Sequence, residues 1–397
     1  MSEPIELRHG RVVTPTGVIA NGRVVLVEDQ IAHVGEANGV PHPRSNVLDV
    51  GGRVVLPGLI DLHGDDIEQH RAPRAGAQVD ARNAVSSVDR ANALTGVTTK
   101  FHAIAFEDDA DDGRSIDEAE TLSRAVTAAE ETLVDNRVHV RSGLSHESVD
   151  AVERVLAEDG VDVDLLSVMH HAPGDGQFDE AGFEQHYSND RNLPAEKVKN
   201  LAEAREKLSS STKDERVARV ADLADDASVT LASHDDETAA AVDRMARRDA
   251  SISEFPLTIE AAERAVERGM TTAMGAPNLV RGGSLWDNLS ARSAIRADAV
   301  DVLCSDYHPP SLLNAPFVAT DEPLPTRVNR VTRNPAEAVG LHDRGRLETG
   351  ARADVIVVDP SPAPSVERVF VAGSEVLTAG ATRDQPAERV GLSGPGS

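Results

Sequence analysis

The sequence predicts an α/β protein: a (β/α)8 TIM barrel with a small β-sandwich-like domain formed by the N- and C-terminal segments. Between residues 57 and 345, eight short apolar stretches alternate with helix-like segments, as in a parallel α/β architecture. Residues 1–56 and 346–380 show short β-like runs separated by turns, without a helical period. Because such a barrel uses about 250 residues as one unit, the remaining length suits a small second domain.

The candidate barrel strands are apolar and are bounded by polar residues, Gly or Pro. Residues 174–214, after the fourth of them, are polar and charge-dense, so we expect an insertion on the face where barrel enzymes keep their active sites. This insertion is either a lid over the active site or a solvent-exposed loop without a function in catalysis, and the sequence leaves both interpretations open. Residues 381–397 predict a disordered tail. In chain order the candidate strands are VVLPGLIDLH, GVTTKFHA, VHVRSGL, DLLSVMHH, SVTLASHDD, ISEFP, TTAMGAP and VDVLCSDYH.

Acidic residues dominate the charge of the chain. The 67 Asp and Glu residues against 40 Lys and Arg give a net charge of -27, which argues against a nucleic-acid partner. No stretch is long and apolar enough to span a bilayer, and the N-terminus lacks the pattern of an export signal. We therefore expect a cytoplasmic protein with a small-molecule substrate and no membrane partner, and the sequence is also compatible with a homo-oligomer.

His and Asp residues end four of the eight candidate strands. Because the carboxyl ends of barrel strands meet at one mouth, we expect these residues at a single centre. Imidazole and carboxylate groups are ligands for zinc, manganese and iron, so the sequence predicts one or two divalent metal ions, with zinc as the first expectation. The predicted ligands are His63, Asp65, His171, His234 and Asp306, with His170 as the alternative to its neighbour His171. Asp235 is either a carboxylate that fixes the tautomer of a ligating His or a polar loop residue.

Several motifs resemble the amidohydrolase superfamily. The segment LPGLIDLHGD at the first candidate strand and TRNPAEAVGLHDRGRLETGARADVIVVD near the end carry this resemblance, which spans residues 11–376. The stretches MGAPNLVRGGS and SDYHPPSLL are more specific. They resemble the α-D-ribose 1-methylphosphonate 5-triphosphate diphosphatase family. The resemblance implies metal-dependent hydrolysis of this triphosphate to a 5-phosphate and diphosphate (pyrophosphate), in phosphonate catabolism.

Two departures from the superfamily pattern leave the metal count and the bridging ligand open. His63 and Asp65 stand where most members carry two His residues, and His170 and His171 occupy the place of the bridging carboxylated Lys.

For a triphosphate, the chain offers a proton acceptor and several cations. Asp306 is the predicted general base, with a metal-ligand role as the alternative. Arg281, Gly282 and Gly283 follow the seventh candidate strand, close to the phosphate-binding quarter of many barrels. Arg74 and Lys100 are further candidates for substrate binding, and His308 is either an acid for the leaving diphosphate or a structural residue.

Two other functions fit parts of the same pattern. A hydrolase of a cyclic amide or an N-acyl substrate would keep the fold and the metal but would need no cluster of cations. A non-catalytic scaffold of the same fold would bind no metal, and the set of candidate ligands favours an enzyme over it.

The dispersed acidic surface predicts a dependence on salt. Of the 40 basic residues only five are Lys, and this composition is typical of halophilic proteins. We expect a higher melting temperature in molar salt than in dilute buffer, because salt screens the repulsion among the excess carboxylates. Thermal unfolding followed by circular dichroism tests this, and equal melting temperatures in the two buffers would contradict it.

Overall fold

A computed structural model describes residues 3–42, 44–74, 76–108, 114–169 and 209–379. Within these ranges eight parallel strands form one sheet in the order β6 to β13, and a bridge between Gly64 and Asp306 links its two edges. The predicted barrel is confirmed, and each predicted stretch supplies one barrel strand. The first four residues of VVLPGLIDLH, Val54–Pro57, instead form β5 of the second sheet. The strands are β6 (Leu59–Gly64), β7 (Val97–Phe106), β8 (Asp135–Ser142), β9 (Val163–Val168), β10 (Thr230–His234), β11 (Ile252–Glu254), β12 (Thr271–Gly275) and β13 (Val302–Cys304).

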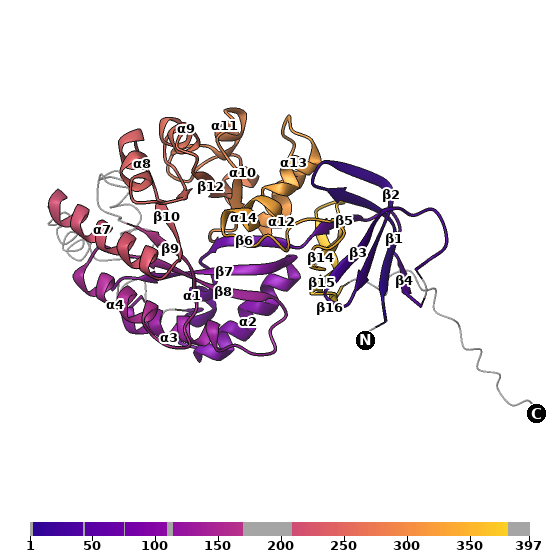
Figure 1. Cartoon of the computed structure of the whole chain (residues 1–397), viewed down its shortest axis with the longest axis horizontal. Helices are drawn as coiled ribbons and strands as arrows, with labels where there is room; N and C mark the ends of the chain where they lie inside the picture. Colours follow the sequence, from indigo (N-terminus) through magenta and orange to yellow (C-terminus); the bar gives the residue numbers. More distant parts are fainter. Residues whose placement is uncertain (1–2, 43, 75, 109–113, 170–208, 380–397) are drawn as a thin grey trace, which may run out of the picture.

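Helices follow the strands and cover the outside of the barrel (Figure 1). Several begin where a Ser or Thr side chain accepts a hydrogen bond from a backbone N–H in the first turn, as Ser145 and Thr258 do. The principal helices are α2 (Ala81–Leu94), α3 (Ile116–Thr127), α4 (His146–Leu156), α7 (Ser210–Asp226), α8 (Ala239–Ala246), α9 (Ile259–Glu267), α11 (Ala291–Arg296) and α14 (Arg333–Ala338). The other helices are α1 (Asp66–Arg71), α10 (Ala276–Arg281), α12 (Pro310–Asn314) and α13 (Leu324–Asn329).

The two ends of the chain pair in a second sheet beside the barrel (Figure 1). Ile31 in β3 donates its N–H to Ala351 O before β14 (2.8 Å), so β3 lies against the segment that leads into β14. The predicted composite β domain is therefore confirmed, and its strands belong to one hydrogen-bonded sheet. They are β1 (Ile5–Thr14), β2 (Gly17–Val27), β3 (Gln30–Glu36), β4 (Asn46–Asp49), β5 (Val54–Pro57), β14 (Val355–Asp359), β15 (Ser365–Val371) and β16 (Ser374–Thr378).

A buried ion-pair network closes the seam between β6 and β13. Asp61 accepts hydrogen bonds from Ser305 N (2.9 Å) and Ser305 Oγ (2.5 Å), so its carboxylate joins the two strands. Lys100 Nζ lies 2.6 Å from Asp61 and 2.7 Å from Asp66. Gly64 leaves room for this ammonium group, because a Cβ there would lie 1.9 Å from Nζ. The network places the ends of β6 and β13 side by side.

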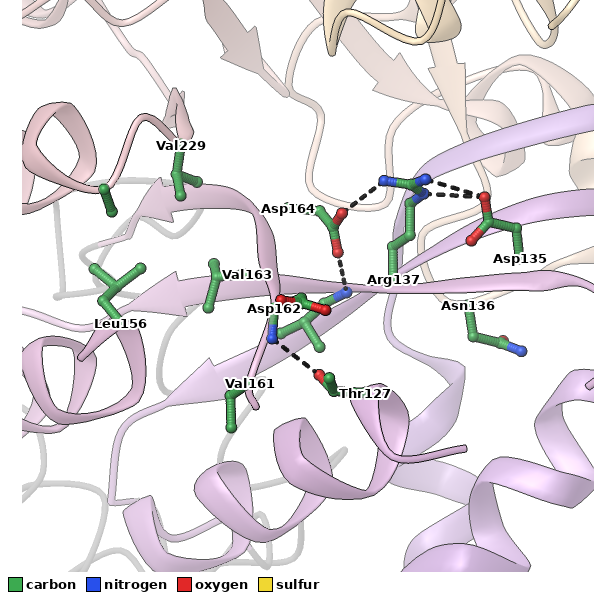
Figure 2. Close-up of a pocket in the computed structure, with 12 residues that line it drawn as sticks. Thr127, Asp135, Asn136, Arg137, Leu156, Val161, Asp162, Val163, Asp164 and Val229 are labelled. Atoms are coloured by element: carbon green, nitrogen blue, oxygen red, sulfur yellow. Dashed lines mark hydrogen bonds and ion pairs between the residues drawn. The ribbon is translucent and has the colours of Figure 1, made fainter. Parts of the chain in front are cut away.

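At the opposite end of the barrel, Arg137 ties β8 to β9. Figure 2 shows its guanidinium between Asp135, at 3.1 Å, and Asp164, at 2.6 Å. Burial raises the pKa of Asp164 and outweighs the opposing effect of Arg137. Asp135, Arg137 and Asp164 line a pocket at the amino ends of the barrel strands. Active sites of such barrels lie at the carboxyl ends, so we assign these ion pairs to the stability of the fold and not to catalysis.

Part of the predicted insertion, residues 174–208, and the predicted tail, 381–397, lie outside the described residues. The last residues of that insertion, 210–214, form the first turn of α7, so this barrel helix begins earlier than the sequence predicted. Among the described residues, no helix combines the length and the apolar character needed to cross a membrane.

Candidate functional site

The carboxyl ends of the barrel strands bring five of the predicted site residues to one cavity of about 370 Å³. His63 is the last residue but one of β6, His234 ends β10, and Asp306 follows β13. Asp65 and Asp235 come directly after β6 and β10. These residues approach from different sides of the barrel because parallel strands all end at the same mouth.

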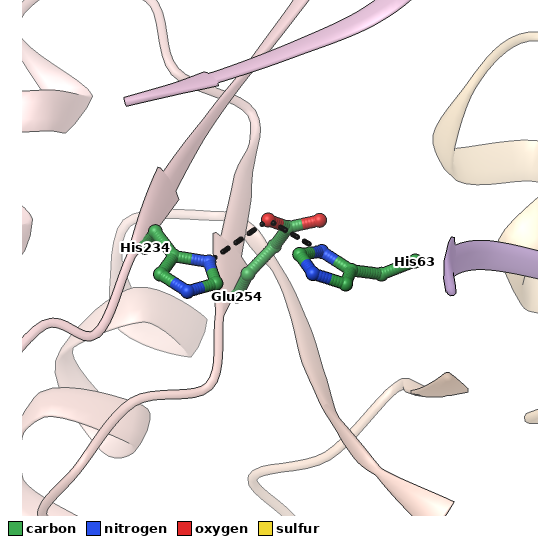
Figure 3. Close-up of side chains that lie close together, drawn as sticks. All are labelled: His63, His234 and Glu254. Carbon is green, nitrogen blue, oxygen red and sulfur yellow. Dashed lines mark hydrogen bonds and ion pairs between the residues drawn. The ribbon is translucent and has the colours of Figure 1, made fainter. Parts of the chain in front are cut away.

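Glu254, the last residue of β11, lies between two of the imidazoles. Its Oε2 atom is 3.2 Å from His63 Nδ1 and 3.3 Å from His234 Nδ1 (Figure 3). The two rings are stacked, with centroids 5.4 Å apart and an angle of 18° between their planes. The carboxylate accepts a hydrogen bond from His234 Nδ1 and lies within ion-pair distance of His63 Nδ1, and the Nε2 atoms of both rings face the other side. That other side carries the aspartates, with Asp65 3.4 Å from His63 Nε2 and Asp235 3.7 Å from His234 Nε2.

Phe255 and His139 hold the imidazole pair in place. The edge of the Phe255 ring meets His63 at 4.9 Å and His234 at 5.3 Å between centroids. The backbone of Phe255 has a φ of 53°, a strained conformation for a bulky residue, and such strain is often found at functional sites. His139 contacts the edge of His63, and its own nitrogens bind Leu62 O (3.0 Å) and Ser167 Oγ (2.9 Å).

Arg141, near the end of β8, reaches into the same mouth. Its guanidinium lies 3.2 Å from Asp65 Oδ1 and 3.4 Å from His234 Nε2, and only 4% of the residue is exposed. The cation therefore links residues from β6 and β10 across the opening of the barrel.

The charges of the site shift the pKa values of its members strongly. Burial opposes protonation of His63, but the carboxylates of Glu254 and Asp65 outweigh burial and raise its pKa to about 9. Burial likewise disfavours the charged form of Glu254, yet His63 and His139 hold its pKa well below the usual range. For His234 burial dominates, and its pKa is lowered. Glu254 is therefore ionised and carries the negative charge between the imidazoles.

The pKa of Asp306 shifts in the opposite direction to that of Glu254. Burial and the neighbouring carboxylate of Asp65 raise its pKa to about 7. Its carboxylate faces Gly275, where an added Cβ would lie 3.1 Å from Oδ2. A carboxylate that is half protonated near neutral pH can take up a proton during a reaction.

The donor set suits a divalent transition-metal ion. His63, His234 and Glu254 each offer one ligand atom, and these atoms lie within 4.8 Å of one another. Glu254 Oε1 is buried without a hydrogen-bond partner among the residues that the structure describes. Two imidazoles and a carboxylate are a ligand set of catalytic zinc sites. A metal ion would displace the proton from His63, because ligating imidazole is neutral.

Other predicted site residues lie elsewhere. His170 and His171 are outside the described residues. The substrate-binding role predicted for Lys100 is corrected: its side chain has no exposed surface and pairs with Asp61 and Asp66 in the barrel seam. The residues that line the cavity do not include this lysine.

Arg74 and His308 are not among the residues that line the cavity either. Arg74 is exposed, and its backbone bridges to Ala77. His308 is also exposed, and its Nδ1 lies 2.8 Å from Ser311 Oγ. This contact within one turn is typical of a structural role for His308.

The glycine pair after β12 has a structural role that the sequence did not reveal. Gly282 N and Gly283 N both donate to Asn278 O, at 3.1 and 3.0 Å, and Gly282 caps α10 with a φ of 94°. Their predicted role as backbone donors to phosphate is corrected, because both N–H groups already close the helix. Arg281 does line the cavity, and its guanidinium donates to Gly283 O at 2.7 Å.

Glu254 and Arg141 belong to the site but were not predicted from the sequence. Both lie inside predicted strands, ISEFP and VHVRSGL, where a charged residue among apolar neighbours is the available signal. A charge at such a position is almost always paired when it is buried, but the sequence does not show which residues pair with it.

Similarity to known proteins extends along most of the chain. α-D-Ribose 1-methylphosphonate 5-triphosphate diphosphatase of Escherichia coli (strain K12) is 34% identical over 361 residues, which cover 86% of this chain and 94% of that protein. No family model matches the chain.

Solved structures share the fold at low sequence identity. The crystal structure of an amidohydrolase has a TM-score of 0.64 at 16% identity, over 95% of this chain and 99% of that one. The crystal structure of 5-methylcytosine deaminase from Klebsiella pneumoniae, liganded with phosphonocytosine, has a TM-score of 0.64 at 13% identity and covers 96% of this chain and all (100%) of that one.

The position of Glu254 generates a prediction for metal affinity. Glu254→Gln keeps the size of the side chain but removes the charge beside both imidazoles. We expect metal to bind at least about 10-fold more weakly, because the variant removes the charge of one of the three candidate ligands. Competition with a chromophoric chelator measures this affinity.

Asp236→Asn is a matched control. Asp236 is a buried carboxylate near the site, but it accepts hydrogen bonds from Ser233 and from Ser253 (2.7 Å) instead of contacting an imidazole nitrogen. It should leave metal affinity unchanged. Wild-type affinity in Glu254→Gln would show that Glu254 does not support the metal.

Proposed function

The chain belongs to the amidohydrolase superfamily, in the family of α-D-ribose 1-methylphosphonate 5-triphosphate diphosphatase, and from this we propose that it is a metal-dependent triphosphate hydrolase. Its proposed substrate is α-D-ribose 1-methylphosphonate 5-triphosphate, with the 5-phosphate and diphosphate as products. The observation that carries the proposal is the 34% identity to the Escherichia coli diphosphatase over 94% of that protein. The cavity supports it with two arginines, Arg141 and Arg281.

The proposed metal ligands are His63, His234 and Glu254, whose ligand atoms cluster within 4.8 Å. Zinc is the ion that we expect there, because the set combines imidazole and carboxylate. A divalent ion at this centre supplies Lewis acidity toward water and toward a phosphoryl oxygen. The carboxylate of Asp65, predicted as a ligand from the sequence, lies 3.2 Å from Arg141, and we assign it to holding that guanidinium.

Asp306 is the proposed general base. Its raised pKa, about 7, allows it to accept the proton of the attacking water near neutral pH. The water oxygen then forms a bond to the α-phosphorus. The bond from that phosphorus to the oxygen bridging to the β-phosphorus breaks, and diphosphate leaves with the electron pair.

The two arginines are proposed to bind the phosphate chain. Arg141 lies beside the imidazoles, and Arg281 lies at the end of α10 on the wall of the cavity. In a chain of net charge -27, these local cations are needed because the overall field repels an anionic substrate.

Product analysis of Asp306→Asn beside the wild type tests the reaction. With metal-loaded wild-type protein we expect release of diphosphate from the ribose triphosphate. Asp306→Asn should lower kcat/KM by at least about 100-fold, the usual contribution of a general base, while the bound metal is retained. Loss of the metal together with activity would make Asp306 a ligand instead of a base.

A parallel assay with cyclic amides and N-acyl compounds covers the alternative chemistry. Turnover of one of these, without release of diphosphate from the triphosphate, would replace the proposal by an amide hydrolase. A wild-type protein that binds no metal and turns over neither class would instead fit the scaffold.

Arg281 gives a second test of the proposed substrate. Because Lys cannot reproduce two parallel hydrogen bonds to a phosphate, Arg281→Lys should weaken kcat/KM for the triphosphate by about 1.5–3 kcal/mol of transition-state stabilisation. Arg292→Lys is the matched control, since Arg292 also donates to a backbone carbonyl, Ala319 O, but does not line the cavity. Equal kinetics for Arg281→Lys and wild type would remove Arg281 from the phosphate site.

A further inference from the structure

The candidate active-site cavity is lined by two chemically different sets of residues. One set is the cluster of imidazoles and carboxylates described above, together with Arg141. The other set is apolar and aromatic, and much of it comes from the loop between α10 and α11, residues 282–290. We call this second set the apolar wall. It consists of Leu257, Leu285, Trp286, Leu289 and Tyr307.

Asn278 in α10 anchors this loop at both of its ends. At the start of the loop, the backbone O of Asn278 accepts hydrogen bonds from the two glycine N–H groups that follow α10, at 3.1 and 3.0 Å. At the end, Asn278 Nδ2 donates to Leu289 O (3.0 Å), and Leu289 N donates to Leu257 O (2.9 Å). The segment that carries Trp286 is therefore tied to the barrel on both sides, so the apolar wall is part of the fold.

Trp286 and Tyr307 bring an aromatic side chain each to the apolar wall. Trp286 is half-buried and Tyr307 is 40% exposed, so both residues keep surface that a ligand can cover. Burial raises the pKa of Tyr307 and outweighs the opposite effect of Arg281. The phenol of Tyr307 therefore keeps its proton and adds a hydroxyl group to the wall, close to a cation.

We propose that the apolar wall is a sugar-binding subsite, in which Trp286 packs against the carbon face of the ribose ring of the substrate. This inference rests on the triphosphate hydrolysis proposed above. The triphosphate and the methylphosphonate of that substrate are anionic and need cations, whereas the ribose is neutral and presents both C–H groups and hydroxyl groups. Such a ring fits a wall of aromatic and apolar side chains with a few polar groups. Trp286 thus selects a triphosphate that is linked to a sugar over inorganic triphosphate.

Tryptophan fluorescence and calorimetry of the metal-loaded, full-length protein test the subsite without an activity assay. Trp286 is the single tryptophan of the chain, so the tryptophan emission reports on the apolar wall. The probes are ribose 5-phosphate and methyl phosphate, two phosphate monoesters of which only the first carries a sugar, and neither carries a methylphosphonate. We expect ribose 5-phosphate to change the emission and to bind at least about tenfold more tightly than methyl phosphate, because it covers apolar surface.

Two variants of Trp286 separate an aromatic face from apolar bulk. Trp286→Leu keeps an apolar side chain without a ring, and Trp286→Phe keeps a ring. In isothermal titration calorimetry, Trp286→Leu should bind ribose 5-phosphate about tenfold more weakly than the wild type, and Trp286→Phe should stay within about threefold of it. The affinity for methyl phosphate should be unchanged in both variants.

Val280→Ala is the matched control. Val280 is an apolar residue of α10 that is 40% exposed, just before the loop, but it is not among the described residues that line the cavity. This variant should bind both probes as the wild type does. Thermal unfolding of each variant verifies that it is folded.

Each outcome distinguishes the sugar subsite from the proposed reaction. Equal affinities of the wild type for the two probes would overturn the subsite, and this comparison needs no variant to fold. Wild-type affinity for ribose 5-phosphate in Trp286→Leu, or an equal loss for both probes, would also overturn it. In these cases release of diphosphate from the ribose triphosphate would still support the proposed reaction. Sugar-dependent binding without that release would support the subsite and overturn the reaction.

Discussion

The closure of the barrel between its first and last strands is the constraint on which the site depends. The backbone at the end of β6 bridges to Asp306 just after β13, and the side chain of Asp61 adds hydrogen bonds to Ser305 beside it. The buried ammonium of Lys100 compensates the charge of Asp61. As a result His63 and Asp306 are held together by a backbone hydrogen bond of 2.9 Å, although they lie far apart in the chain.

Electrostatic pairing then decides what each carboxylate of the site can do. The neighbouring imidazoles hold the pKa of Glu254 well below its usual range, and Arg141 and His63 lower the pKa of Asp65. For Asp306, burial and the charge of Asp65 dominate and raise the pKa to about 7. Glu254 and Asp65 are therefore anions, whereas Asp306 can accept a proton near neutral pH.

Much of the architecture could be predicted because its signals are local. Each barrel strand is a short apolar run, and a His or Asp at the end of such a run points to the mouth whatever the rest of the chain does. For this reason His63, His234 and Asp306 could be assigned to one centre before any coordinates were known. The predictions for Lys100 and for the pair Gly282–Gly283 failed because they depended on which partners were already bound. Lys100 forms ion pairs with Asp61 and Asp66, and the two glycine N–H groups donate hydrogen bonds to Asn278 O.

The sequence by itself determined the class of fold, the strands that carry the candidate ligands, and the excess of acidic charge. Only the tertiary structure decided that Glu254 lies between the imidazoles and that Arg141 spans Asp65 and His234. These contacts join strands β6, β8, β10 and β11, and their distances depend on the closure and twist of the whole barrel. Local sequence patterns fix the direction of a side chain on its own strand, whereas the partner across the barrel follows from packing over the entire chain.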